Sequence, residues 1–212
     1  MKPQRVLIAL LLAGFGTSAA ADPLAAGRQV VLHGGSAGTT PCAACHGAEG
    51  SGDAAAGFPR LAGQNAAYLT KQINDIRGGN RASPIMRAAV RGLTAQEIQA
   101  VAAYYAAQRP APDKHAEGAI DGAGEQLARH GDPASQVPAC DSCHGPDGRG
   151  VAPTFPALAG QHPGYLLAQL EAFHRGDRHN DAGGIMAAVA KKLNEAQMGA
   201  VANYFANLKT AP

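Results

Sequence analysis

The pentapeptide Cys42-Ala43-Ala44-Cys45-His46 returns 98 residues later as Cys140-Asp141-Ser142-Cys143-His144. A second stretch, Phe58-Pro59-Arg60-Leu61-Ala62-Gly63-Gln64, returns 97 residues later as Phe155-Pro156-Ala157-Leu158-Ala159-Gly160-Gln161. Single residues recur at the same 97-residue spacing: Tyr68 with Tyr165, Gln72 with Gln169, and Arg81 with Arg178. Self-similarity at a fixed period predicts two copies of one structural unit in tandem.

The regions outside the two copies predict a leader and a linker. Lys2 and Arg5 precede the apolar run 6–15, and an Ala19-x-Ala21 pattern stands before Asp22, as in a secretory signal peptide. The run is short for a membrane span, which needs about 20 residues; an uncleaved anchor is the alternative. Polar, proline-interrupted residues follow the first copy. We predict a signal peptide at 1–21, domains at 22–108 and 121–212, and a linker at 109–120.

Apolar spacing predicts three helices in each copy and no strand. The first helix covers 23–33 and 122–130, and the second covers 66–77 and 163–174. The last helix opens on a capping box, Thr94-Ala95-Gln96-Glu97, and its counterpart starts near Asn194. Long loops rich in Gly and Pro join these helices. The chain has no Trp and is only 5% aromatic, so a bound planar cofactor would supply apolar filler that the side chains lack.

A Cys-x-x-Cys-His sequence is the attachment signal for a c-type haem. Two thiols at this spacing can add to the two vinyl groups of one porphyrin, and the adjacent histidine can reach the iron. Three alternatives compete. They are two disulfides in an exported protein, a thioredoxin-like redox site, and a zinc ion held by Cys42, Cys45, Cys140 and Cys143. The first leaves the histidines unexplained, the second expects a βαβ pattern, and the third leaves the rest of the repeat unexplained.

The sixth ligand of each iron is predicted from the methionines. Met86 follows His46 by 40 residues and Met186 follows His144 by 42, both in regions that we expect to be loops. A thioether in this position raises the reduction potential and leaves no site where oxygen can bind. Met198 aligns with a helix face and is expected in the core. Histidine is the competing ligand type, through the matched pair His33 and His130, or through His174 and His179, which occur only in the second copy.

With these residues assembled, the chain resembles the dihaem cytochrome c4 family over nearly all of its length after residue 21. The resemblance implies an all-α fold of two tandem cytochrome c-like domains, each a small helical bundle with long loops around one covalently bound haem. It implies that Cys42 and Cys45 hold haem 1, with His46 and Met86 as axial iron ligands. It also implies that Cys140 and Cys143 hold haem 2, with His144 and Met186 on its iron.

The same resemblance implies a periplasmic electron carrier rather than an enzyme. Its expected donor is the cytochrome bc1 region of a respiratory chain and its expected acceptor is a terminal oxidase, with peripheral membrane association allowed. The alternatives are a cytochrome subunit of a dehydrogenase for sulfide or alcohol, and a dihaem redox enzyme such as a peroxidase or a thiosulfate-oxidising cytochrome. No long basic run suggests nucleic acid.

The two halves of the chain differ in the sign of their net charge. Residues 22–111 hold 8 basic and 5 acidic side chains, whereas residues 112–212 hold 8 basic and 11 acidic ones. The opposite signs lead to the hypothesis that each half docks a different redox partner by electrostatic steering.

Overall fold

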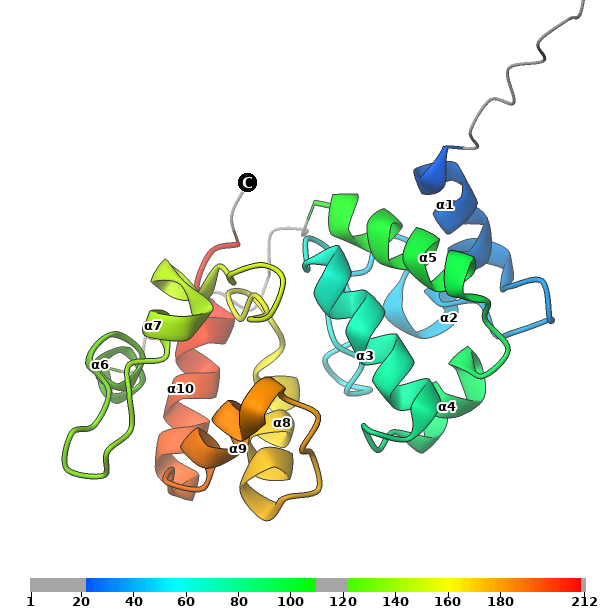
Figure 1. The fold of residues 1–212 in the computed structure, drawn as a ribbon. Helices are drawn as coiled ribbons and strands as arrows, with labels where there is room; N and C mark the ends of the chain where they lie inside the picture. Colours follow the sequence, from blue (N-terminus) through cyan, green and yellow to red (C-terminus); the bar gives the residue numbers. More distant parts are fainter. Residues whose placement is uncertain (1–21, 110–121, 211–212) are drawn as a thin grey trace, which may run out of the picture.

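The computed structural model describes residues 22–109 and 122–210, which form two helical domains side by side (Figure 1). The predicted signal peptide and nearly all of the predicted linker lie outside these residues. The first domain contains five α-helices: α1 (Pro23–His33), α2 (Ala43–His46), α3 (Ala66–Gly78), α4 (Pro84–Val90) and α5 (Ala95–Ala107). The second contains their counterparts: α6 (Gly122–His130), α7 (Asp141–His144), α8 (Pro163–Arg175), α9 (Ile185–Ala190) and α10 (Glu195–Asn207).

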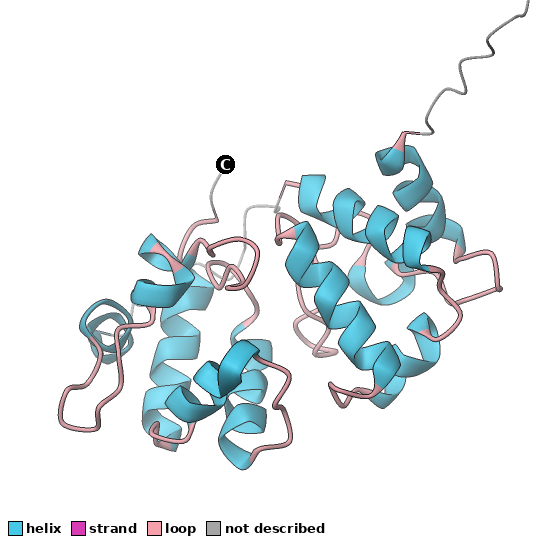
Figure 2. Cartoon of the chain, viewed as in Figure 1, coloured by secondary structure: helices cyan, strands magenta, loops and turns pink. Residues whose placement is uncertain are grey.

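The three predicted helices of each copy are present within a residue or two of the predicted ends, and the all-α fold is confirmed. No β-strand occurs in the described ranges, where the only strand-like pairs are isolated bridges (Figure 2). The predicted capping box at Thr94 forms, and the counterpart helix has one at Asn194 as well. Thr94 accepts from the Glu97 N–H and Asn194 accepts from the Gln197 N–H, and each helix begins at the next residue. The four short helices α2, α4, α7 and α9 were not predicted, because four to seven residues are too few to show a helical period.

Each domain is built on a close crossing of its first and last helices. A Cβ atom added to Gly27 of α1 would lie 2.2 Å from the carbonyl oxygen of Ala100 in α5. At the equivalent crossing, a Cβ on Gly124 of α6 would lie 2.3 Å from the carbonyl oxygen of Ala200 in α10. Only glycine allows backbones to approach this closely, so the repeated glycine determines how these helices pack.

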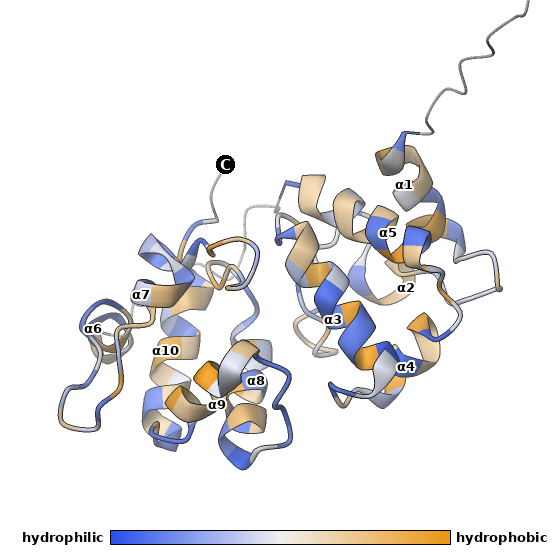
Figure 3. Ribbon diagram, in the orientation of Figure 1, coloured by the Kyte–Doolittle hydropathy of each residue, from blue (hydrophilic) through white to orange (hydrophobic). Residues whose placement is uncertain are grey.

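Buried apolar side chains form one core in each domain. The first core is built mainly from Val31, Leu69, Ile76, Ile98 and Tyr105. The second is built mainly from Leu127, Leu166, Met198, Val201 and Phe205. Met198 is 2% exposed, which confirms that it packs in the core. Apolar and polar residues both occur along the long helices, which have a core side and a polar side (Figure 3).

The loop after each Cys-x-x-Cys-His motif folds back over the last helix of its own domain. The N–H of Gly63 donates to the carbonyl of Tyr105, and the N–H of Gly160 donates to the carbonyl of Phe205. A Cβ on Gly50 would meet the Tyr105 ring at 2.6 Å, and one on Gly148 would meet Phe205 at the same distance. These glycines have φ of +75° and +66°, so they combine a left-handed conformation with a tight contact.

Helices α3 and α8 face each other across the domain boundary (Figure 1). In the part of the chain that the structure describes, no helix is long and apolar enough to span a bilayer.

Candidate haem-attachment sites and the domain interface

The two histidines of the repeated motifs are buried and held identically. His46 ends α2, and its Nδ1 lies 3.0 Å from the carbonyl oxygen of Pro59. His144 ends α7, and its Nδ1 lies 2.9 Å from the carbonyl oxygen of Pro156. A carbonyl oxygen only accepts, so Nδ1 of each ring carries the proton and Nε2 keeps its lone pair. Burial lowers the pKa of both imidazoles, although the hydrogen bond to the carbonyl opposes it, so both rings are neutral at pH 7.

The Nε2 atom of His46 tests whether this site fits a haem iron. It has no hydrogen-bond partner, and it is buried, in a side chain that is only 4% exposed. A buried lone pair without a partner is costly. A neutral imidazole with its second nitrogen fixed on a carbonyl is the usual arrangement of a metal-ligating histidine. The residues therefore fit a haem whose iron would take this nitrogen.

The positions of the cysteines also suit a haem. All four are free and half-buried. In each pair the first cysteine directly precedes a short helix and the second lies within that helix. Burial raises the pKa of Cys42 to about 11 and that of Cys140 to about 12, so both are protonated thiols. The described residues contain no cluster of three or more His, Cys, Asp or Glu side chains suited to a metal ion. Both the disulfide and the zinc alternatives lose their support.

The expectation that Met86 and Met186 lie in loops is wrong. Met86 lies in the first turn of α4, which begins at Pro84, a residue suited to the first position of a helix. Met186 lies at the start of α9, where the Asp181 carboxylate accepts from the N–H groups of Met186 and Ala187 at 2.7 and 3.2 Å. Both thioethers are half-buried, and Met86 packs against the first core with Cys42.

The competing histidines have other positions. His33 and His130 are the exposed last residues of α1 and α6. His174 is exposed and its Nδ1 lies 2.9 Å from the carbonyl oxygen of Ala190. His179 is exposed beside the carbonyl of Gly176. All four of these histidines are therefore at the surface.

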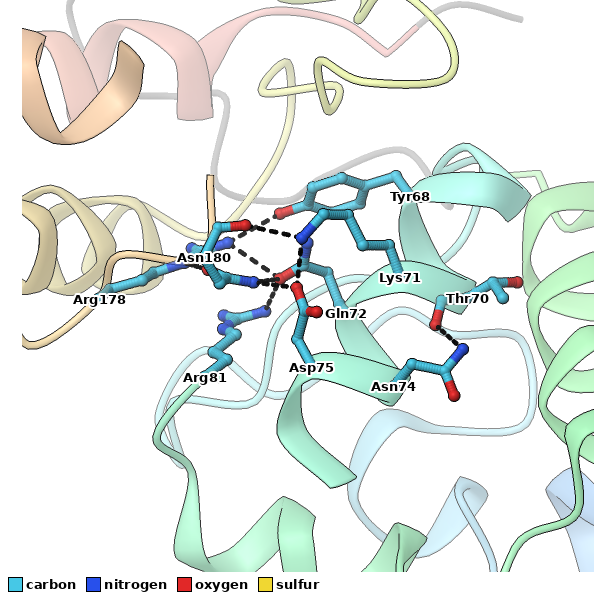
Figure 4. Close-up of polar contacts among 9 residues, drawn as sticks. All are labelled: Tyr68, Thr70, Lys71, Gln72, Asn74, Asp75, Arg81, Arg178 and Asn180. Carbon is cyan, nitrogen blue, oxygen red and sulfur yellow. Dashed lines mark hydrogen bonds and ion pairs between the residues drawn. The ribbon is translucent and has the colours of Figure 1, made fainter. Parts of the chain in front are cut away.

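The repeated tyrosines and arginines meet at the domain boundary, which the sequence did not reveal. Figure 4 shows Tyr68, Arg81 and Arg178 of this contact. Arg178 donates to the Tyr68 hydroxyl oxygen at 3.2 Å and to Gln72 Oε1 at 3.1 Å. In the reciprocal contact, Arg81 donates to the Tyr165 hydroxyl oxygen and to Gln169 Oε1, both at 2.8 Å. Burial opposes ionisation of Tyr165, but the charges of the two arginines outweigh it and lower the pKa of that hydroxyl.

Asn180 of the second domain also contacts the first domain. Asn180 donates to Gln72 Oε1 at 3.0 Å and to the Asp75 carboxylate at 2.6 Å (Figure 4). Its backbone carbonyl accepts from Lys71, which also pairs with Asp75. The equal spacing of the tyrosines, glutamines and arginines was the signal in the sequence, but spacing alone does not indicate that each copy contacts the other.

Comparison with known proteins agrees with this geometry. The chain matches the cytochrome c family over residues 33–107 and again over 123–209, so it is a tandem of two cytochrome c domains. Each domain has one haem-attachment motif, and the protein carries two covalently attached haem c groups, through Cys42 with Cys45 and Cys140 with Cys143. It is 38% identical to the cytochrome c4 of Pseudomonas aeruginosa, over 96% of this chain and 98% of that one. The chain belongs to the dihaem cytochrome c4 family.

Two further similar proteins are named for thiosulfate dehydrogenase. The chain is 45% identical to the thiosulfate dehydrogenase electron acceptor of Stutzerimonas stutzeri, over 86% of each chain. It is also 45% identical to a region of the thiosulfate dehydrogenase (TsdBA) structure from Marichromatium purpuratum, with a TM-score of 0.82. That match covers 88% of this chain but only 40% of the longer one.

Proposed function

We propose that this protein is a periplasmic electron carrier in which His46 with Met86, and His144 with Met186, complete the coordination of the two haem irons. The observation that carries the proposal is the repeated, buried, neutral imidazole fixed by Nδ1 to a proline carbonyl. A bound haem supplies reversible one-electron exchange at its iron. An iron held by both a histidine and a methionine would have no open position for oxygen or peroxide, which supports a carrier and not an enzyme.

Its electron donor, in our proposal, is a thiosulfate dehydrogenase, and its acceptor is a terminal oxidase. The donor is supported by two relatives, 45% and 41% identical, that are named thiosulfate dehydrogenase electron acceptors, whereas the relatives named cytochrome c4 are 36–39% identical. The terminal oxidase as acceptor is supported by the family resemblance. The export pattern at residues 1–21 supports the periplasmic location.

Reduction of the purified holoprotein by thiosulfate tests this function. We expect both haems to remain oxidised with thiosulfate alone and to be reduced within seconds when a catalytic amount of a thiosulfate dehydrogenase is added. Anaerobic stopped-flow absorbance of the reduced haems measures this. The dehydrogenase without thiosulfate serves as the control. Reduction by thiosulfate alone would show that the protein is itself the enzyme.

A second candidate donor is the cytochrome bc1 region, supported by the cytochrome c4 relative that matches over almost its whole length. The same stopped-flow assay with purified bc1 complex and a quinol distinguishes the two. Fast reduction by bc1 with none by the dehydrogenase would replace the proposed donor.

The opposite charges of the two halves predict a dependence on salt. If each half docks its own partner by steering, the second-order rates of reduction and of oxidation should both fall, by roughly tenfold or more, as ionic strength rises from about 0.01 to 0.5 M, because the Debye length falls from about 30 Å to a few Å. Stopped-flow rates at a series of salt concentrations measure this. Rates that do not change with salt would contradict the steering hypothesis.

A further inference from the structure

Each domain has a buried glutamine whose side chain is hydrogen-bonded to the backbone of the other domain. Gln161 of the second domain accepts from the Arg60 N–H at 2.8 Å and donates to the Arg60 carbonyl at 2.9 Å. In the same way, Gln64 of the first domain accepts from the Ala157 N–H at 2.9 Å and donates to the Ala157 carbonyl at 3.1 Å. The two side chains are 7% and 8% exposed, so water does not compete for these bonds.

The peptide group that each glutamine contacts is the one that holds the histidine of the opposite domain. The Pro59 carbonyl, which accepts from His46 Nδ1 at 3.0 Å, and the Arg60 N–H, which donates to Gln161, belong to one peptide unit. A continuous chain therefore runs from the imidazole N–H of His46, through a single peptide, to the side-chain oxygen of Gln161. The reciprocal chain runs from His144 through the Pro156–Ala157 peptide to Gln64.

Each glutamine is itself fixed at the beginning of an interface helix. Gln161 Oε1 also accepts from the His162 N–H at 3.0 Å, directly before α8. Gln64 Oε1 accepts from the Asn65 N–H at 3.1 Å, directly before α3. The acceptor oxygen is thus set by the backbone of its own domain and cannot easily follow a movement of the other domain.

Hydrogen bonds in such a chain strengthen one another. A peptide whose N–H donates becomes a better acceptor at its carbonyl, because both bonds polarise the same amide. A stronger bond from the histidine Nδ1–H makes the imidazole a more basic ligand. A more basic ligand donates more electron density to the iron and stabilises its oxidised state, so it lowers the reduction potential.

We propose that each interdomain glutamine sets the reduction potential of the haem in the opposite domain. Gln161 is a positioning residue for haem 1, and Gln64 is one for haem 2. The inference rests on the proposed function in one respect, namely that His46 and His144 are the iron ligands. The domain contact therefore adjusts the electron affinity of both haems, in addition to holding the domains together.

Methionine at either position tests this proposal, since it keeps the length of glutamine and removes both hydrogen bonds across the boundary, together with the one from the backbone of its own domain. In Gln161→Met we expect the potential of haem 1 to rise, its reduction equilibrium constant increasing about threefold to tenfold, where tenfold corresponds to 59 mV. Haem 2 should change by less than a third of that. In Gln64→Met the pattern should reverse. Potentiometric titration followed by NMR, with resonances assigned around Cys42–His46 and Cys140–His144, measures each haem separately.

The two variants control for each other, because loosening of the interface alone would affect both haems alike in both variants. A third variant, Gln72→Met, removes hydrogen bonds at the same boundary without touching either proline peptide, and it should not produce the crossed pattern. Equal shifts of both haems, a shift confined to the glutamine's own domain, or no shift in either variant would overturn the proposal. If a methionine variant yields no holoprotein, Gln161→Asn and Gln64→Asn should give smaller crossed shifts. A failure of histidine ligation itself would appear in the spectrum of the unmodified protein.

Discussion

Replacing Met86 with alanine should convert haem 1 from a low-spin to a high-spin ferric iron and leave haem 2 unchanged. The thioether is the only strong-field ligand that we propose on that face, and alanine leaves the coordination position open to water or added cyanide. The potential of haem 1 should also fall, because the methionine raises it. The ferric absorption spectrum, cyanide titration and electron paramagnetic resonance measure these changes. Met186→Ala should produce the same result at haem 2.

Met198→Ala provides the matched control. This methionine is 2% exposed in the second core, and its truncation should cost about 2–5 kcal/mol of stability, yet both irons should remain low-spin. A Met86→Ala protein with two unchanged low-spin haems would remove Met86 from the proposed ligand set. The next candidates would then be histidines that the structure places at the surface.

The second large effect is expected at the helix crossing of the first domain. Gly27→Ala should lower the free energy of unfolding by about 3 kcal/mol, because the new Cβ would lie 2.2 Å from a backbone oxygen of α5 and the helices must separate. Chemical denaturation of the holoprotein followed by circular dichroism measures the change. Gly124→Ala should have an effect of similar size, since its Cβ would meet the Ala200 oxygen at 2.3 Å.

Gly199→Ala is the control for the glycine substitutions. Gly199 is also helical, in α10, but a Cβ added there would meet no atom within 4 Å beyond its own helix backbone and chain neighbours. Alanine there should stabilise the protein by about 0.5–1 kcal/mol, through helix propensity alone. Equal effects of Gly27→Ala and Gly199→Ala would show that close approach of the helices is not what the repeated glycine provides.

Most of the fold could be predicted because its signals are local. The long helices have apolar residues at helical spacing, and α1, α3, α5 and α10 also have a capping side chain directly before the first turn, so the predicted ends agree within a residue or two. The short helices were not predicted, because the segments that contain Met86 and Met186 are too short to show a helical period. Pro84 stands in the first turn of α4, and the Asp181 carboxylate accepts from two N–H groups in the first turn of α9.

The parts of the candidate sites that consist of neighbouring residues in the sequence were predicted. Two thiols and a histidine within five residues are sufficient to indicate a covalent haem. The hydrogen bond from His46 to Pro59 was not predictable, because the two residues are 13 apart and joined by an irregular loop. The pairing of Arg81 with Tyr165, and of Arg178 with Tyr68, was likewise hidden, although all four residues stood out in the repeat.

The sequence by itself therefore determined that the protein has two copies of one helical unit, with a haem-attachment motif in each. Those features depend on residue type and spacing along the chain. Only the tertiary structure decided which side chains act across the boundary, and it assigned Gln161 to the peptide that holds His46 and Gln64 to the one that holds His144. The reason is physical. A contact between residues about 100 positions apart depends on how two folded domains pack, and neither copy contains that information alone.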